Sequence, residues 1–280
     1  MAQPRAATPG LAPEVATLLA DHLLAAADDE LVLGHRHAEW TGFGPDIESD
    51  IALSSVAQEE IGHARLLYQM VLGLQGRSEE EVDRLAFGRP PQAFRNAVLL
   101  ERPNDGGLEP PPEGEPAWRG EWGFAIVRMV LYDRADAIRL ETWASGGHAP
   151  LAALARTLAR EERYHRLFAE TWLERLAGGG PAAAARLQRV LDAVWGEALG
   201  LFEATDGEAV LVAHGLLARS SSEQAERWRD EVAALLEGMG LRPGRGPAAT
   251  GGRAGRHTPD LTALLEEMTS VWRLDPEARW

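Results

Sequence analysis

The sequence predicts an all-α protein built on a four-helix bundle, with additional C-terminal helices. Apolar residues recur every three or four positions through four long segments, and no segment shows the strict alternation of a β-strand. Two of these segments carry a Glu-x-x-His pattern on their apolar stripe, and each of the other two carries an acidic residue there. Four long helices around a polar centre explain this distribution.

The first half of the chain is expected to form one helical hairpin. Pro13 suits the first turn of a helix, and the glycines and proline of residues 42–45 break that helix. A Pro- and Gly-rich stretch at about residues 88–116 is expected to be irregular. The expected helices cover about residues 13–40, 46–74 and 79–87.

The second half is expected to form a similar hairpin followed by further helices. Gly146 and Gly147 separate its two long helices, and three glycines at residues 178–180 end the second one. Residues 242–256, rich in Gly, Pro and Arg, are expected to form a loop. The expected helices cover about residues 117–145, 149–176, 181–204, 221–238 and 259–273.

The two hairpins look like a quasi-repeat joined by one long crossover, which is a connection found in ferritin-like bundles. We therefore expect residues 11–280 to form a single ferritin-like helical domain with a C-terminal extension. Residues 1–10 are rich in Pro and Ala and lack the apolar core of a secretory signal, so we expect a short disordered tail there.

Composition narrows the possible partners and chemistry. The formal net charge of −15 disfavours nucleic acid or an anionic membrane as a partner, and no apolar run is long enough to span a membrane. The chain has no cysteine, so disulfides, iron–sulfur clusters and thiolate-bound zinc are excluded. We expect a cytoplasmic protein in which any metal is held by nitrogen and oxygen ligands.

The Glu-x-x-His patterns pair Glu60 with His63 and Glu162 with His165. A spacing of three places both side chains on one helix face, and here that face is the apolar stripe. An upstream acid precedes each pattern at nearly the same distance. Because a buried carboxylate is costly unless it is paired or bound to metal, these residues predict a carboxylate-bridged di-metal site. The candidate ligands are Glu30, Glu60, His63, Asp133, Glu162 and His165.

Two alternatives to a working metal site remain open, a relic site and a buried polar network. A single Glu-x-x-His is weak evidence, because a chain of this composition contains about one by chance. The upstream acids also have close rivals, since Asp29 precedes Glu30 directly and Asp136 follows Asp133 by three residues.

Oxygen-rich ligands with two imidazoles suit iron or manganese, so we expect a di-iron centre, with manganese as a possible replacement. A metal-bound histidine usually donates its second N–H to a carboxylate or a carbonyl. His37 lies two turns after Glu30 on the same stripe, and we expect it to be a hydrogen-bonded core histidine that supports the site rather than a ligand. The carboxylates that could orient the ligand histidines are Asp29, Asp136, Glu59 and Glu161.

Several short motifs, spread over most of the chain beyond about residue 20, match a known family. They lie at residues 31–36, 39–42, 50–53, 62–65, 163–165, 172–176, 251–258 and 264–268, with Trp280 at the end. On these motifs the chain resembles the structural (C) subunit of the bacterial ring 1,2-phenylacetyl-CoA epoxidases. The most specific motif is Gly-Gly-x-x-Gly-x-His-Thr at residues 251–258.

This resemblance implies a ferritin-like fold and a role in aerobic phenylacetate catabolism, as part of a multicomponent di-iron monooxygenase. It also implies an acyl-CoA substrate, a separate NADPH-dependent reductase, and assembly with a related catalytic (A) subunit or with itself. The C subunits usually lack a full ligand set and act as scaffolds. This chain departs from that pattern, because Glu60 and His63 stand where C subunits usually have non-ligands. The spacing of its six candidate ligands matches that of the A subunit.

Three functions are therefore compared. The first is an oxygenase subunit with a working di-iron site, and the second is a non-catalytic scaffold subunit with a structural or vestigial metal site. The third, a ferritin-like iron-handling protein, is disfavoured because such proteins are shorter chains without the helices expected after residue 181. We expect association through residues 88–116 and 242–280, because both are Pro- and Gly-rich extensions of the bundle.

Overall fold

The computed structural model describes residues 10–106 and 121–276. The described part is helical, with short 3-10 turns between the helices. Its helices are α1 (Pro13–Ala38), α2 (Ile47–Leu74), α3 (Val82–Phe87), α4 (Trp122–Ala144), α5 (Ala149–Ala177), α6 (Pro181–Leu199), α7 (Glu208–Ala213), α8 (Ser221–Gly238) and α9 (Pro259–Met268).

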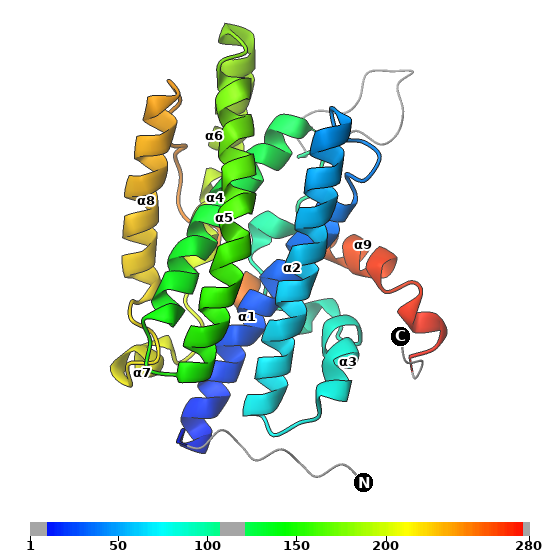
Figure 1. Cartoon of the computed structure of the whole chain (residues 1–280), viewed down its shortest axis with the longest axis vertical. Helices are drawn as coiled ribbons and strands as arrows, with labels where there is room; N and C mark the ends of the chain where they lie inside the picture. Colours follow the sequence, from blue (N-terminus) through cyan, green and yellow to red (C-terminus); the bar gives the residue numbers. More distant parts are fainter. Residues whose placement is uncertain (1–9, 107–120, 277–280) are drawn as a thin grey trace.

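Four long helices form two antiparallel hairpins that lie side by side (Figure 1). α1 packs on α2 and α4 packs on α5, while α6 and α8 cover the outer side of α4. Most residues of α4 are consequently buried, and the first half of the helix is apolar on nearly every face. Within the described residues, no helix combines the length and apolar character that a membrane span needs.

The all-α fold and the four long helices predicted from the sequence are confirmed, with small differences at the ends. α2 begins after Asp46 because the carboxylate of Asp46 accepts a hydrogen bond from the Ser49 amide at 2.7 Å. α4 begins at Trp122. The predicted start of this helix at residue 117, like the predicted tail at residues 1–9, lies outside the described residues.

The second half of the chain contains two departures from the predicted helices. α6 ends at Leu199 rather than near residue 204, because a 3-10 turn at residues 200–202 follows it. α7 was not predicted, since a helix of six residues is too short to show a 3.6-residue period. α9 ends at Met268, and a further 3-10 turn covers residues 272–274.

The described part of the crossover, residues 88–106, is irregular as predicted but packs tightly on the chain itself. Phe94, Leu99 and Leu100 are completely buried. The carboxylate of Asp28 in α1 accepts a hydrogen bond from the Arg95 amide at 2.7 Å and pairs with Arg89. This part of the crossover therefore contributes to the core instead of extending away from the bundle.

The C-terminal arm, residues 251–258, is held against the crossover by glycines and by a buried acid. A Cβ atom on Gly252 would lie 2.1 Å from the carbonyl oxygen of Asn96, so only glycine fits there. Glu101 is fully buried and accepts hydrogen bonds from the Thr258 amide at 2.7 Å and from His257 Nδ1 at 2.6 Å. The motif at residues 251–258 thus fastens the C-terminal arm to the crossover by close backbone packing and by hydrogen bonds to Glu101.

Trp228 on α8 tests whether the outer helices stabilise the bundle. The indole of Trp228 is fully buried, donates to the Leu131 carbonyl in α4 at 2.9 Å, and packs on Trp195 with ring centroids 5.2 Å apart. Trp228→Ala should lower the free energy of unfolding by about 3–5 kcal/mol, as measured by urea denaturation. Arg229→Ala, an exposed position on the same helix, should change it by less than about 0.5 kcal/mol. Equal values for the two variants would show that α8 contributes little.

Candidate metal centre

All six candidate ligands converge on the interior of the bundle, one acid from each long helix and one histidine each from α2 and α5. None of the six is more than 3 % exposed. One ligand atom from each of four residues lies within 4.8 Å of the others, and these residues are Glu30, Glu60, His63 and Glu162. Three helices, α1, α2 and α5, thus supply a compact set of oxygen and nitrogen atoms that could hold a metal ion.

The two histidines point the same ring nitrogen towards this centre. His63 Nδ1 lies 3.2 Å from a Glu162 oxygen and 4.0 Å from a Glu60 oxygen. His165 Nδ1 lies 3.4 Å from Glu60 and 3.3 Å from Glu162. Two ligand atoms that are each about 2.1 Å from one metal ion lie roughly 3 Å apart, so these separations suit a shared cation. Glu60 and Glu162 each lie near both histidines, as bridging ligands would.

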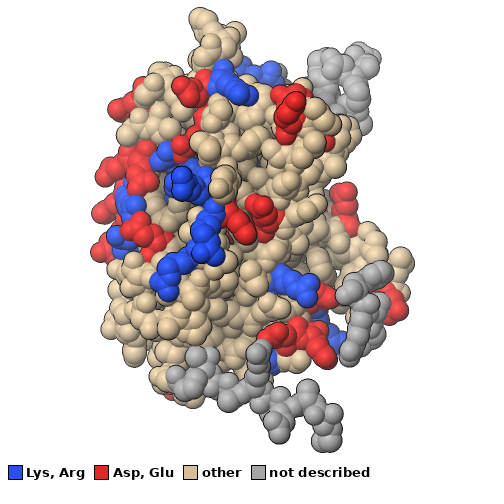
Figure 2. Space-filling model, viewed as in Figure 1, with Lys and Arg blue, Asp and Glu red and all other residues tan. Residues whose placement is uncertain are grey.

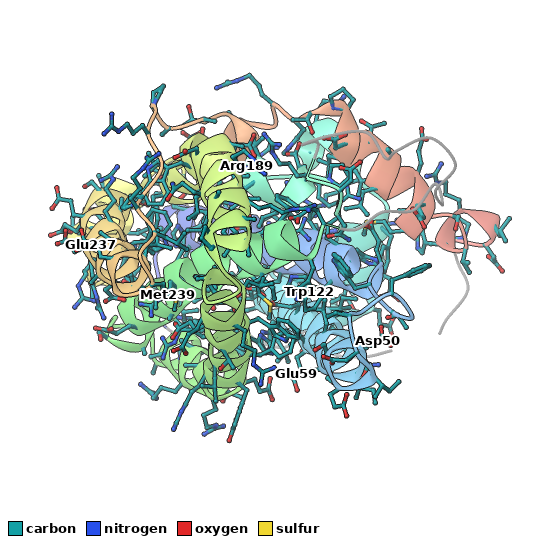
Figure 3. All side chains as sticks on the ribbon, turned by 90° about the horizontal axis from the view of Figure 1, so that it is seen from above. Asp50, Glu59, Trp122, Arg189, Glu237 and Met239 are labelled. Atoms are coloured by element: carbon teal, nitrogen blue, oxygen red, sulfur yellow. The ribbon has the colours of Figure 1, made fainter. Side chains whose placement is uncertain are left out.

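The outward ring nitrogens are fixed by a crossed pair of glutamates. His63 Nε2 on α2 lies 2.8 Å from Glu161 on α5, and His165 Nε2 on α5 lies 2.6 Å from Glu59 on α2. Glu59 lies on the side of α2 that faces α5 (Figure 3), and acidic side chains reach the surface along this seam (Figure 2). A proton on each Nε2, donated to a glutamate, leaves the Nδ1 lone pair directed into the centre.

Many polar atoms at this centre have no hydrogen-bond partner. Both carboxylate oxygens of Glu60, Asp133 and Glu162 are buried without a donor. The Oε2 atom of Glu30 and the Nδ1 atom of His165 are in the same state. Burial of a carboxylate without a partner costs several kcal/mol, so this concentration calls for cations or protons at the centre.

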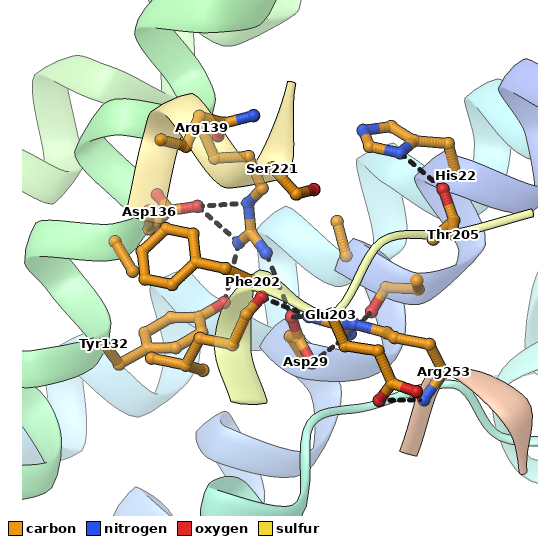
Figure 4. A pocket seen from close by; sticks show the side chains of 15 residues that line it. His22, Asp29, Tyr132, Asp136, Arg139, Phe202, Glu203, Thr205, Ser221 and Arg253 are labelled. Carbon is orange, nitrogen blue, oxygen red and sulfur yellow. Dashed lines mark hydrogen bonds and ion pairs between the residues drawn. The ribbon is translucent and has the colours of Figure 1, made fainter. Parts of the chain in front are cut away.

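The rival acids occupy different positions from the candidate ligands. Asp29 binds Arg253 in a two-point ion pair at 2.8 Å and Arg139 at 3.0 Å. Asp136 binds Arg139 (Figure 4). Both aspartates were expected as candidate partners of the ligand histidines, but they hold arginines instead, and the glutamates Glu59 and Glu161 hold the histidines.

His37 is buried as expected, but it is not hydrogen-bonded. Neither ring nitrogen of His37 has a partner, which corrects the expectation of a satisfied core histidine. Burial and the nearby charges of Arg128 and His165 lower the pKa of His37 well below its usual value. His37 is therefore neutral beside the centre.

Sequence reasoning missed Tyr132 and Arg139 of α4. The Tyr132 hydroxyl donates to Glu30 Oε1 at 2.8 Å, and Arg139 Nη2 donates to the same oxygen at 2.7 Å. Tyr132 directly precedes Asp133, and Arg139 follows Asp136 by three residues, so both lie beside acids that the sequence had already singled out. Their partner lies more than a hundred residues away, which the helical period does not reveal.

The ionic groups of the centre leave an excess of negative charge. Six buried carboxylates belong to it, and two arginines, Arg139 and Arg253, neutralise part of their charge. With neutral histidines, four negative charges remain, which two divalent cations would balance. The six carboxylates are Asp29, Glu30, Glu60, Asp133, Asp136 and Glu162.

Without metal, protons must supply this balance. Burial and the charges of Glu30 and Glu162 raise the pKa of Glu60 well above its usual value, and burial with Glu162 does the same for Asp133. Burial opposes the charged form of His63, but its contacts with Glu162 and Glu30 raise the pKa to about 12. The metal-free centre therefore holds extra protons that divalent ions would displace.

Comparison with known proteins identifies the family of this chain. The chain matches the family described as phenylacetic acid catabolic protein over residues 7–280. It belongs to this family. A member from Escherichia coli (strain K12), the C subunit of 1,2-phenylacetyl-CoA epoxidase, is 29 % identical over 263 residues, which cover 94 % of this chain and 99 % of that protein. The family resemblance expected from the sequence motifs is confirmed.

The metal-free protein is expected to lose stability as pH rises. Burial raises the pKa of Asp136 to about 8, and the pKa values of Glu60, Asp133 and His63 are also raised. A group with a raised folded-state pKa stabilises the fold below its unfolded pKa and loses that contribution as pH rises through the folded value. Chelator-treated protein should therefore have a lower melting temperature at pH 8.5 than at pH 6.

Glu30 and Glu162 act in the opposite sense, because their pKa values are lowered, and their contribution is lost only below about pH 4.5. They do not affect the comparison between pH 6 and 8.5. A melting temperature that rises over this interval would contradict the protonation pattern described above.

Proposed function

We propose that this protein is a subunit of a multicomponent phenylacetyl-CoA epoxidase and that it carries a carboxylate-bridged di-iron site. The observation that supports the metal site best is the set of buried, unpartnered carboxylate oxygens around two inward-facing histidine nitrogens. The family match and the similarity to an epoxidase subunit support a role in phenylacetate catabolism. The metal-free alternative requires the same centre to be balanced by protons alone.

The donor set fits two iron ions. Glu30, His63 and the two central glutamates would hold one metal, and Asp133, His165 and the same two glutamates would hold the other. Carboxylates and imidazoles suit iron or manganese better than zinc, and the chain has no thiolate to offer. Asp133 is not in the compact group of four and has a shorter side chain, so we assign it a terminal position on one metal.

The chemistry that bound iron would supply is the reduction of O2 by two electrons with two protons, so that one oxygen atom is transferred to an aromatic ring and the other leaves as water. The protein would fix the geometry and exclude water. Glu59 and Glu161 orient the histidines, and the nearly complete burial of the ligands keeps solvent away. The electrons would come from a separate NADPH-dependent reductase, and the substrate would be an acyl-CoA thioester.

A scaffold subunit with a vestigial or structural metal site is the second candidate. The Escherichia coli relative is a C subunit, which favours it. The cavity beside Tyr132 and Arg139 measures about 50 Å³, which is smaller than a cavity of about 150 Å³ that binds benzene in another protein. In this case the chain would assemble with a related ferritin-like catalytic (A) subunit, which would bind the substrate.

Iron content tests the metal site directly. Purified protein from iron-rich cultures should hold about two irons per chain, and Glu60→Ala should hold far less than one, because both metals lose a shared ligand. The bundle of Glu60→Ala should stay folded by circular dichroism, since removal of an unpaired buried charge does not destabilise the core. Glu48→Ala, an exposed position on the same helix, should keep the wild-type iron content.

Turnover of the whole complex separates the two candidate functions. The protein, its partner subunits and the reductase should consume NADPH and O2 with phenylacetyl-CoA, and the Glu60→Ala complex should lose this activity. Full activity of the Glu60→Ala complex would exclude catalysis at this site and leave the scaffold function. Wild-type protein without iron would exclude the metal site itself.

A further inference from the structure

Arg139 of α4 reaches the metal centre through Glu30. Its Nη2 atom donates to Glu30 Oε1 at 2.7 Å, and the Tyr132 hydroxyl donates to the same oxygen at 2.8 Å. The other oxygen of Glu30, Oε2, has no hydrogen-bond partner and lies 3.8 Å from His63 Nδ1. One oxygen of Glu30 is thus occupied by two donors, and the other is directed at the centre.

Arg139 is itself held in a fixed orientation by two aspartates. Its Nε atom donates to Asp136 at 2.8 Å, and its Nη1 atom donates to Asp29 at 3.0 Å (Figure 4). Three carboxylates therefore surround one guanidinium group, which matches the planar fork of arginine and not the point charge of lysine. This arrangement fixes where the positive charge lies relative to Glu30.

Asp29 is fixed in turn by Arg253 from the C-terminal arm. The two terminal nitrogens of Arg253 each donate to one oxygen of Asp29 at 2.8 Å. The arm is anchored near this point, because the Gly251 amide donates to Glu203 at 2.7 Å. The motif at residues 251–258 is thus linked to Glu30 by a series of ion pairs. Arg253 binds Asp29, Asp29 binds Arg139, and Arg139 binds Glu30.

We infer that Arg139, braced by Asp29 and by Arg253 of the arm, positions Glu30 and supplies a fixed positive charge beside the metal centre. This inference rests on the proposed di-iron site. It restricts Glu30 to one free oxygen, and it opposes oxidation of the nearby metal, because each step of oxidation adds positive charge next to a guanidinium group. Arg139 and Arg253 are positioning residues, since neither faces the centre directly.

The reduction potential of the bound iron tests this inference, because a merely structural role would not change it. Iron-loaded wild-type protein and variants are titrated anaerobically by spectroelectrochemistry after their iron content has been measured. Arg139→Gln should lower the midpoint potential, since it removes the charge. Arg253→Gln should lower it by a smaller amount, because Arg253 acts from one contact further away. Arg139→Lys should lie closer to the wild-type value than Arg139→Gln does.

Arg256→Gln is the matched control. Arg256 is exposed and lies on the same arm, three residues after Arg253, so this change removes the same charge without touching Asp29. It should leave the potential at the wild-type value. If Arg139→Gln fails to fold, the midpoint potentials of Arg253→Gln and Arg256→Gln are sufficient to test the inference.

The outcomes separate this inference from the proposed function. Iron-loaded variants at Arg139 and Arg253 with wild-type potentials, or with higher ones, would overturn the role of the two arginines and leave the di-iron site standing. A lower midpoint potential in Arg253→Gln than in Arg256→Gln would support the role of Arg253 in holding Asp29 and Arg139. Wild-type protein that binds no iron would overturn both the proposed site and this inference.

Discussion

The burial of acidic groups in the centre of the bundle is the constraint on which the rest of the structure depends. Four of the six buried carboxylates have at least one oxygen without a hydrogen-bond donor, and two arginines offset only part of the charge. A helical core tolerates this only when cations or protons supply the balance and when the surrounding helices hold the groups in place. The tight packing of α1 on α2 and of α4 on α5, with α6 and α8 covering α4, meets the second condition.

The sequence revealed most of the fold and the identity of the central residues. The 3.6-residue period placed the long helices, and the two Glu-x-x-His patterns placed four of the candidate ligands on buried faces. It could not choose between Asp29 and Glu30, because neighbours differ by about 100° around a helix and α1 is buried on nearly all sides at this level. The choice depends on Arg253, whose contact with Asp29 spans more than two hundred residues.

The described parts of the crossover and of the C-terminal arm pack on the chain itself, which their composition does not suggest. Gly and Pro predicted irregular extensions available for contacts between subunits, yet the described residues of the crossover bury Phe94, Leu99 and Leu100. Glycine in the arm serves close packing, since Gly252 touches the backbone of Asn96. The family motif is distant from the candidate ligands in sequence, yet its Arg253 binds Asp29, the residue that directly precedes Glu30.

The distance between two bound irons is the most direct test of this account. X-ray absorption spectroscopy of the iron-loaded protein should show an iron–iron scattering shell at roughly 3.5–4 Å, together with oxygen and nitrogen neighbours and no sulfur. Glu60 and Glu162 lie near both histidines, which is the arrangement that such a pair requires. Iron bound without an iron–iron shell would contradict a carboxylate-bridged pair and would show that the buried acids of this bundle serve another purpose.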